Sequence, residues 1–194
     1  MFSSWVPTLI GFVMIGFTSN AQNTAVAKSD NIPPVVDYQA KTGGSSAKDI
    51  VAVTSTLRDN GTLTNAFKAA GMETDLKSKG PFTVFAPSNI AFEKLPPGLV
   101  EQLMKPENSD KLLKILSYHV VAGKMDINSV KQAIKNGHGK AVFTTLCGNK
   151  LVASIEDNKI KLTDDGDNSC FITVSDLQAS NGIIHVLDKV ALPR

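Results

Sequence analysis

The residues with the greatest capacity for chemistry are three histidines, two cysteines and a short acidic run. His185 and Asp188 lie three positions apart near the end of the chain, and with a serine they would suggest proton transfer in a hydrolase. Residues three apart in a strand point to opposite faces, so this pair could not easily share one proton path. The sequence also has no G-x-S-x-G turn that would expose a nucleophilic serine. We therefore predict no catalytic residues and no enzyme.

The same residues could instead be metal ligands, but their spacing does not favour a metal site. His119, His138 and His185 are far apart and form no H-x-x-x-H pair, and the two cysteines have no C-x-x-C spacing. The run DDGDN, Asp164 to Asn168, is acidic enough to attract Ca²⁺, but it lacks the ligand spacing and closing glutamate of an EF-hand loop. We predict a solvated turn there, and neither a metal nor a cofactor for the chain.

Short helices around one strand are predicted for the first half of the folded part. Apolar residues recur at helical spacing after Asp49 and again from Leu63 to Ala70. The stretch Phe82 to Ala86 is aromatic and β-branched, which is typical of a buried strand whose alternate residues face opposite sides. Pro87 ends that strand and Ser88 predicts the start of a helix. Further helices are predicted at 99–104, along NSDKLLKILSYHVV into a strand at 119–121, and from Asn128 or Ser129 through Ile134.

The second half is predicted to be rich in β-strands. The stretch LVASIEDNKIKL alternates apolar and polar residues around Asp157-Asn158, and both of these residues tolerate the positive φ of a hairpin turn. Residues directly opposed across such a turn have numbers adding to 315, as 157 and 158 do. Cys147 then faces position 168, and Cys170 is a diagonal neighbour on the same face. We predict a Cys147–Cys170 disulfide, which would add roughly 3 kcal/mol by closing a chain loop.

The N-terminal residues indicate export. The first 27 residues carry no charged side chain, and the apolar run from Val6 to Phe17 is too short to span a bilayer. Small residues follow at Ser19-Asn20-Ala21, so we predict a signal peptide over residues 1–21, with cleavage after residue 27 as the alternative. An uncleaved membrane anchor is the other interpretation. Residues 22–46, rich in Asn, Ala, Pro, Gly and Ser, predict a flexible linker. We therefore expect a secreted or periplasmic protein with no stable membrane insertion after cleavage.

The overall composition is that of an ordinary globular protein. Hydrophobic residues make up 42% of the chain and charged residues 20%, with a net charge of +2. Because the charge is small and the lysines are scattered, no electrostatic field points to nucleic acid or to anionic lipid.

Three stretches resemble the signature motifs of fasciclin (FAS1) domains. They are GPFTVFAPSNIAF, YHVV and NGIIHVLDKVALP, in the same order and at similar separations. The resemblance covers roughly residues 47–193, which we therefore identify as one fasciclin domain. It implies an α+β fold, a β-sandwich-like wedge with several short helices packed along it. It also implies a single-domain, exported protein that works in adhesion, and the short signal favours a bacterial source.

The resemblance also implies which residues meet a partner and which are structural. In some animal members of the family, an Asp followed by an aliphatic residue and a Tyr-His pair are linked to integrin recognition. The matching positions are Asp176-Leu177 and Tyr118-His119, although Ser175 stands where such motifs often carry proline. We expect His185, Asn181 and Gly182 to be structural, because an interior imidazole normally has hydrogen-bond partners.

Two classes of function remain open at this stage. The first is an extracellular interaction module that binds a cell-surface or matrix protein, or a glycan. The alternative is a small-molecule carrier or an enzyme with an apolar pocket.

Overall fold

The computed structural model describes residues 48–77 and 80–194 of the 194-residue chain. The predicted signal peptide, 1–21, and the predicted linker, 22–46, lie outside the described residues, so both stay predictions. The described residues belong to one compact unit, Ala40–Arg194.

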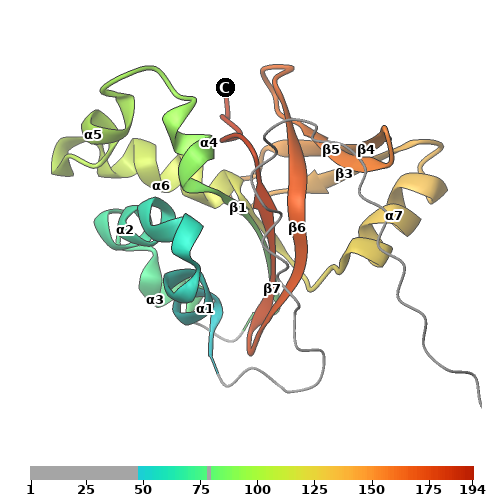
Figure 1. Ribbon diagram of the computed structural model, residues 1–194, viewed down its shortest axis with the longest axis horizontal. Helices are drawn as coiled ribbons and strands as arrows, with labels where there is room; N and C mark the ends of the chain where they lie inside the picture. Colours follow the sequence, from blue (N-terminus) through green and yellow to red (C-terminus); the bar gives the residue numbers. More distant parts are fainter. Residues whose placement is uncertain (1–47, 78–79) are drawn as a thin grey trace, which may run out of the picture. The chain divides into compact units, whose positions relative to one another are not determined.

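The helices are short, and all of those described precede the run of strands at 140–187, so the helix-rich part comes first, as the sequence predicted (Figure 1). Three of them begin at a residue whose side chain accepts a backbone N–H: Asp49 for α1, Ser88 for α4 and Asp126 for α7. The α-helices are α1 (Ile50–Thr56), α2 (Gly61–Ala69), α3 (Glu73–Leu76), α4 (Asn89–Glu93), α5 (Leu99–Leu103), α6 (Ser109–Tyr118) and α7 (Ile127–Asn136). Two 3₁₀ turns, Arg58–Asn60 and Pro106–Asn108, connect them.

Seven strands form one sheet in the order β2-β1-β7-β6-β5-β4-β3. They are β1 (Phe82–Pro87), β2 (Val120–Ala122), β3 (Lys140–Thr144), β4 (Lys150–Glu156), β5 (Lys159–Thr163), β6 (Ser169–Ala179) and β7 (Gly182–Leu187). The long strand β6 pairs with β5 at its start and with β7 further along, so it belongs to both halves of the sheet. A bridge between Val121 and Thr145 links the two end strands, which brings the sheet partly around on itself.

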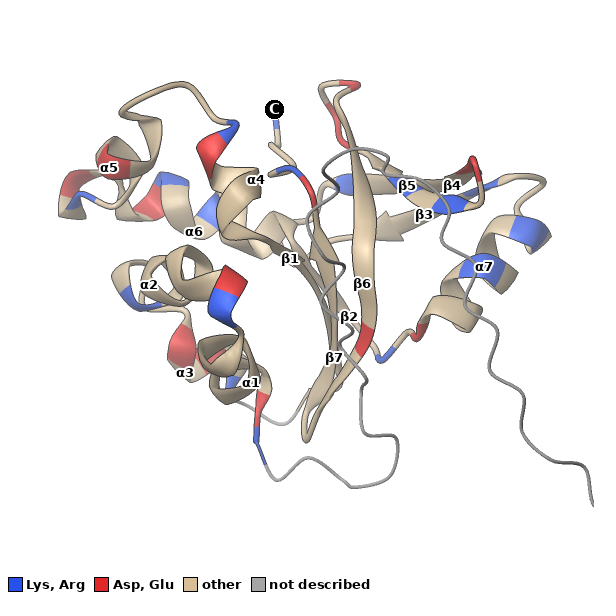
Figure 2. Cartoon of the chain, in the orientation of Figure 1, with Lys and Arg blue, Asp and Glu red and all other residues tan. Residues whose placement is uncertain are grey.

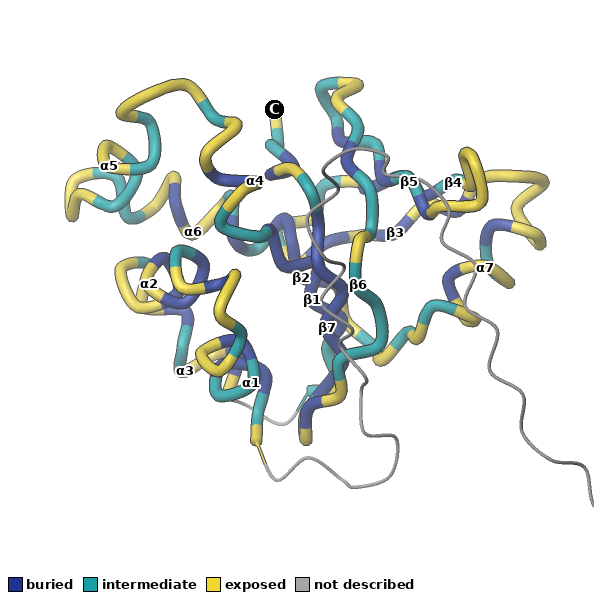
Figure 3. Tube along the Cα trace, viewed as in Figure 1, coloured by how far each residue is buried: buried dark blue, intermediate teal, exposed yellow. Residues whose placement is uncertain are grey.

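Two hydrophobic clusters fill the domain, one for each half of the sheet (Figure 3). Val84 and Ala86 contribute to the cluster under α1 to α6, whereas Phe85 points into the cluster enclosed by β3, β4, β5 and α7. This alternation along β1 is the one that the sequence predicted. The β4–β5 hairpin also has the predicted register, because Glu156 pairs with Lys159 and Val152 with Thr163.

The α+β fold class is confirmed, with short helices packed along a bent, sandwich-like sheet. The central parallel pair, β1 beside β7, joins segments 100 residues apart, as in the pairing of Phe85 with His185. Among the described residues, no helix is long and apolar enough to cross a membrane.

Candidate functional site

His185 lies in the middle of β7 and is completely buried. Its ring stacks on Phe85 of the neighbouring strand, with the two ring centroids 5.7 Å apart. The backbone N–H of Asp176 donates to Nδ1 at 3.3 Å, so Nδ1 carries no proton, and Nε2–H donates to the Met125 carbonyl at 2.8 Å. Burial lowers the pKa of His185, although the hydrogen bond to Met125 and the charge of Asp176 oppose the shift. The ring is therefore neutral at pH 7, with both nitrogens engaged.

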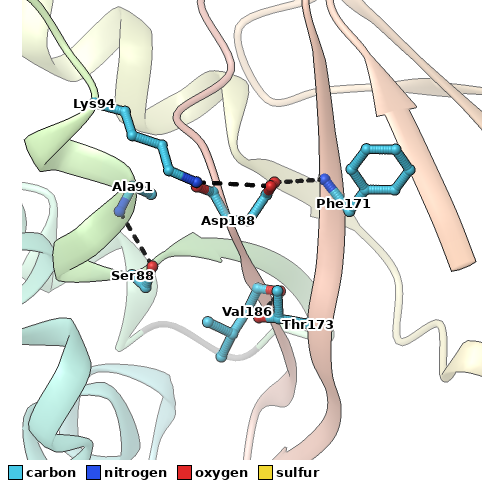
Figure 4. Close-up of polar contacts among 7 residues, drawn as sticks. All are labelled: Ser88, Ala91, Lys94, Phe171, Thr173, Val186 and Asp188. Atoms are coloured by element: carbon cyan, nitrogen blue, oxygen red, sulfur yellow. Dashed lines mark hydrogen bonds and ion pairs between the residues drawn. The ribbon is translucent and has the colours of Figure 1, made fainter. Parts of the chain in front are cut away.

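Asp188 does not cooperate with His185. Its Oδ1 accepts the backbone N–H of Phe171 at 2.7 Å, and its Oδ2 lies 3.8 Å from Lys94 Nζ (Figure 4). Lys94 also donates to the Asp188 carbonyl, which ties the end of α4 to the end of β7. These contacts give Asp188 the geometry of a connector between elements, and the dyad weighed from the sequence is not formed.

Asp176 and Leu177 are half-buried in β6, where the pairing with β7 is irregular. Asp176 has φ of 64°, a left-handed conformation that displaces its side chain out of the regular strand pattern. Its Oδ1 accepts the N–H of Ile127, the first residue of α7, at 2.8 Å. The carboxylate thus helps to fix the start of α7, while the backbone N–H of the same residue bonds to His185.

His119 ends α6 and is buried, with 2% of its surface exposed. Nδ1–H donates to the Ile115 carbonyl at 2.8 Å, and Nε2 accepts the Ala191 N–H at 3.1 Å. This proton placement is opposite to that of His185, since here Nδ1 is the donor and Nε2 the acceptor. Burial lowers the pKa of His119 to about 4, so this ring too is neutral at pH 7.

Tyr118 is fully buried beside His119. Its hydroxyl donates to the Lys150 carbonyl at 2.7 Å and accepts the Asp165 N–H at 3.1 Å. Burial raises the pKa of the phenol well above its ordinary value. Neither Tyr118 nor His119 is exposed to a partner, so the expectation of direct side-chain contact by this pair does not agree with their burial.

The acidic run from Asp164 to Asn168 is a turn, as predicted, but its first residue is buried and not solvated. Asp164 is only 6% exposed. Its Oδ1 accepts the backbone N–H groups of Gly166 and Asn168, and its Oδ2 accepts the N–H of Leu192. The carboxylate therefore organises its own loop and holds the C-terminal segment. The sequence signal for this role was present, since Asp at the start of a Gly-containing turn commonly accepts backbone N–H groups.

Asn181 and Gly182 connect β7 to the helical half. Asn181 Oδ1 accepts the N–H of Ile50, and its Nδ2 donates to the Leu76 carbonyl. A Cβ added to Gly182 would lie 2.2 Å from the Phe82 carbonyl oxygen and 2.7 Å from Ile50 Cδ1. The Asn side chain therefore bonds two helices, and only glycine fits beside β1 at the next position.

The structure corrects the predicted disulfide, because Cys147 and Cys170 are both free thiols. The hairpin register is as predicted, but β4 begins only at Lys150, and Cys147 lies in the turn after β3. Cys170 lies on β6, opposite Leu162, so both β5 and β4 stand between its strand and β3 in the sheet order. The prediction assumed that the β4–β5 pairing continues as far as Cys147, but the pairing stops before that residue.

Among the described residues, no three His, Cys, Asp or Glu side chains gather in a way that could hold a metal ion.

Residues 59–193 match the Fasciclin domain family, so the chain belongs to the fasciclin family. A relative from the cyanobacterium Synechocystis, Protein sll1483, is 40% identical over 181 residues, which is 93% of this chain and 92% of that protein. Human periostin is 28% identical over 169 residues, covering 85% of this chain but only 18% of periostin. The cyanobacterial match over nearly the whole length supports a bacterial source.

A solved structure gives the same fold. It is a FAS1 domain pair from the insect cell adhesion molecule Fasciclin I, with a TM-score of 0.67 and 16% sequence identity. The similarity covers 75% of this chain and 51% of the insect chain. At this identity the match establishes the fold alone.

Proposed function

We propose that this protein is an exported, non-enzymatic interaction module that binds a protein or a glycan on a cell surface or in an extracellular matrix. The observation that carries the proposal is that the residues with chemical capacity are committed to internal hydrogen bonds. Both buried histidines use both ring nitrogens, and Asp188 binds Phe171 and Lys94. Membership of a family that includes an insect cell adhesion molecule supports the same role.

The surface around the β6 irregularity is the proposed contact region. Asp176 and Leu177 are half-exposed there, and the first residue of α7, Ile127, bonds to Asp176. Tyr118 and His119 would act only indirectly, by holding the β3–β4 turn and the C-terminal segment in place.

The alternative of a carrier or enzyme calls for an apolar pocket with a few converging polar groups. A hollow of about 590 Å³ lies beside α7, and four of its seven lining residues carry an amide or an ammonium group. Such a lining suits a polar partner better than an apolar small molecule.

Cell binding by the exported chain tests the proposal. Purified mature protein coupled to beads should retain cells of the producing species, and soluble protein should compete for the same sites. Beads that carry heat-unfolded protein are the control. Equal retention on both kinds of bead, or no retention by the folded protein, would contradict an interaction role.

Export is tested separately by N-terminal sequencing of protein recovered outside the cytoplasm. The mature chain should begin at Gln22 or at Lys28. An intact Met1 in the membrane fraction would support the uncleaved anchor instead.

A further inference from the structure

One segment of this protein carries a larger net positive charge than the whole chain. Residues 124–161 contain seven lysines and three carboxylates, a net charge of +4, compared with +2 for the whole chain. This segment comprises α7 and the strands that follow it, where Figure 2 shows lysines on α7 and on β3 to β5. The residues that follow, 162–194, carry five carboxylates against two basic groups. The charge is therefore segregated along the fold, although the total charge is small.

The outer face of α7 carries amides and lysines without any carboxylate. Its residues recur at helical spacing, and all of them are exposed: Asn128, Lys131, Gln132, Lys135 and Asn136. Val130 and Ile134 occupy the opposite, buried face. Neither Lys131 nor Lys135 forms an ion pair with any part of the chain that the structure describes. Two like charges one turn apart are mildly unfavourable in an isolated helix, and an anion between them would remove that cost.

A hollow of about 590 Å³ lies between this face and the end of the β4–β5 hairpin. Its rim is polar, with Lys131, Lys135, Asn128 and Gln132, while Ile155, a half-exposed side chain on β4, gives it an apolar side. A sugar ring presents the same combination, since its C–H face is apolar and its hydroxyls both donate and accept hydrogen bonds. Side-chain amides match hydroxyls because each amide also offers donors and an acceptor.

We propose that this groove binds an acidic polysaccharide whose charge is carried by uronate carboxylates. Lys131 and Lys135 meet the carboxylates, Asn128 and Gln132 bond to the hydroxyls, and Ile155 packs against a ring face. Two lysines one helical turn apart, with Cβ atoms about 5–6 Å apart, suit a polymer with one charge on each sugar. Asp126 and Asp176 lie at the N-terminal end of α7, whereas Lys131 and Lys135 lie one and two turns further along, so the carboxylates of the ligand lie toward the C-terminal end of the helix. The inference rests on the proposed interaction role and names the chemistry of the partner.

The groove favours a glycan over an acidic peptide. Peptides commonly bind by adding a strand to a sheet edge or by placing apolar side chains in a hydrophobic groove. Here four of the seven lining residues carry an amide or an ammonium group, and the apolar surface comes from Ile155 and Ile134 together with the alkyl stems of the lysines.

Calorimetric titration of the full mature chain with oligogalacturonate tests the inference. The double variant Lys131→Gln/Lys135→Gln should bind at least tenfold more weakly than the parent protein. The matched control is Lys68→Gln/Lys111→Gln, which removes two exposed lysines from α2 and α6 and should bind like the parent. Binding of neutral dextran should be too weak to measure, and polyglutamate and dextran sulfate should bind more weakly than oligogalacturonate. Melting temperatures show that both variants remain folded.

Three results would overturn the inference: equal weakening in the two double variants, tighter binding of polyglutamate or dextran sulfate than of oligogalacturonate, or no binding of oligogalacturonate to the parent. The bead assay separates this failure from failure of the proposed function. If the parent and the Lys131→Gln/Lys135→Gln variant retain cells equally, the interaction role stands and the groove is not its site.

Discussion

Two buried histidines connect different parts of this domain, and their rings carry the proton on opposite nitrogens. His119 donates from Nδ1 to its own helix and accepts the N–H of Ala191, so it joins α6 to the C-terminal segment. His185 donates from Nε2 to Met125 and accepts the N–H of Asp176, so it joins β7 to the segment before α7 and to the β6 irregularity. The His119 ring therefore connects two segments, and the His185 ring connects three.

The two sites differ in what surrounds the bonded groups. Ala191 is buried, whereas Met125 and Asp176 are both half-exposed. Ile115, the other partner of His119, is half-buried, so the His119 site is the more enclosed of the two, while the His185 site lies beneath the surface proposed for binding. His119 therefore contributes only to stability, whereas His185 contributes both to stability and to the shape of the surface proposed for binding.

The largest effect is expected for His119→Ala. The substitution leaves a cavity and two unsatisfied polar groups at Ile115 and Ala191, which should cost about 4 kcal/mol of unfolding free energy. Urea denaturation measures the loss, and His138→Asn at an exposed position of positive φ is the control. If the two variants unfolded at the same urea concentration, His119 would not be a stabilising connection.

Acid should weaken the wild-type domain through the same residue. The unfolded chain binds a proton at His119 near pH 6.5, but the folded chain does so only near pH 4. The stabilisation is therefore complete above pH 6.5 and is lost as the pH falls from 6.5 to 4, by about 3 kcal/mol. The pKa of His185 is also lowered, so it contributes in the same direction.

Urea denaturation at several pH values between 7 and 4 checks this prediction. The variant His119→Gln cannot titrate, so its stability should depend less steeply on pH than that of the wild type. Equal pH dependence in the two proteins would assign the acid sensitivity to other groups.

His185→Ala is expected to cost less, about 2 kcal/mol, because water can reach the half-exposed groups that the ring leaves behind. Backbone hydrogen exchange should distinguish the His119 site from the His185 site. Loss of His185 should speed exchange around Met125 and at the start of α7, whereas loss of His119 should speed exchange around Ala191. Faster exchange in the same segments for both variants would remove the distinction between the sites.

Much of this arrangement could be predicted from the sequence, because it depends on local patterns. Alternation along Phe82 to Ala86 predicted which residues face each cluster, and Asp157-Asn158 predicted the hairpin and its register. The helix predicted through Ile134 is also present, and it ends at Asn136. In each case the signal lies within a few neighbouring residues.

The remaining features depend on contacts between distant segments. One is the positive φ of Asp176, and another is the hydrogen bond that Asp164 accepts from Leu192. A third is which ring nitrogen of each histidine carries the proton, since this depends on the N–H groups of Asp176 and Ala191. The disulfide prediction was wrong for a related reason, since local register gave no information on where the β3–β4 turn interrupts the ladder.

Two substitutions at Asp176 sharpen the proposed link between the His185 site and binding. Asp176→Asn keeps an oxygen for the Ile127 N–H and tolerates positive φ, so it should change stability by less than about 0.5 kcal/mol. Asp176→Ala removes the acceptor and strains the backbone, which should cost about 1 kcal/mol or more. Thermal unfolding gives both values. If Asp176 contacts a basic group on a protein partner, the Asn variant should lose cell binding at nearly unchanged stability, whereas binding of an acidic polysaccharide should be unchanged or stronger because a negative charge is removed. Unchanged cell binding would leave Asp176 a structural residue only.

The smallest effect on stability is expected from the cysteines, which both pack in the cluster that contains Tyr118. Cys147 is half-exposed and contacts Thr145 and Asn149, and Asn149 bonds to Asp165 beneath the Tyr118 hydroxyl. Cys170 is buried, and burial raises the pKa of its thiol to about 12. Because the thiolate is the reactive form, a maleimide should label Cys147 at least about tenfold faster than Cys170 in the native protein. Labelled Cys147 should loosen the segment around Tyr118, measured by hydrogen exchange, and leave the segment around Met125 unchanged. Detection of no free thiol in the unreduced, denatured protein would restore the disulfide and would show that the turn after β3 lies closer to β6 than the structure places it.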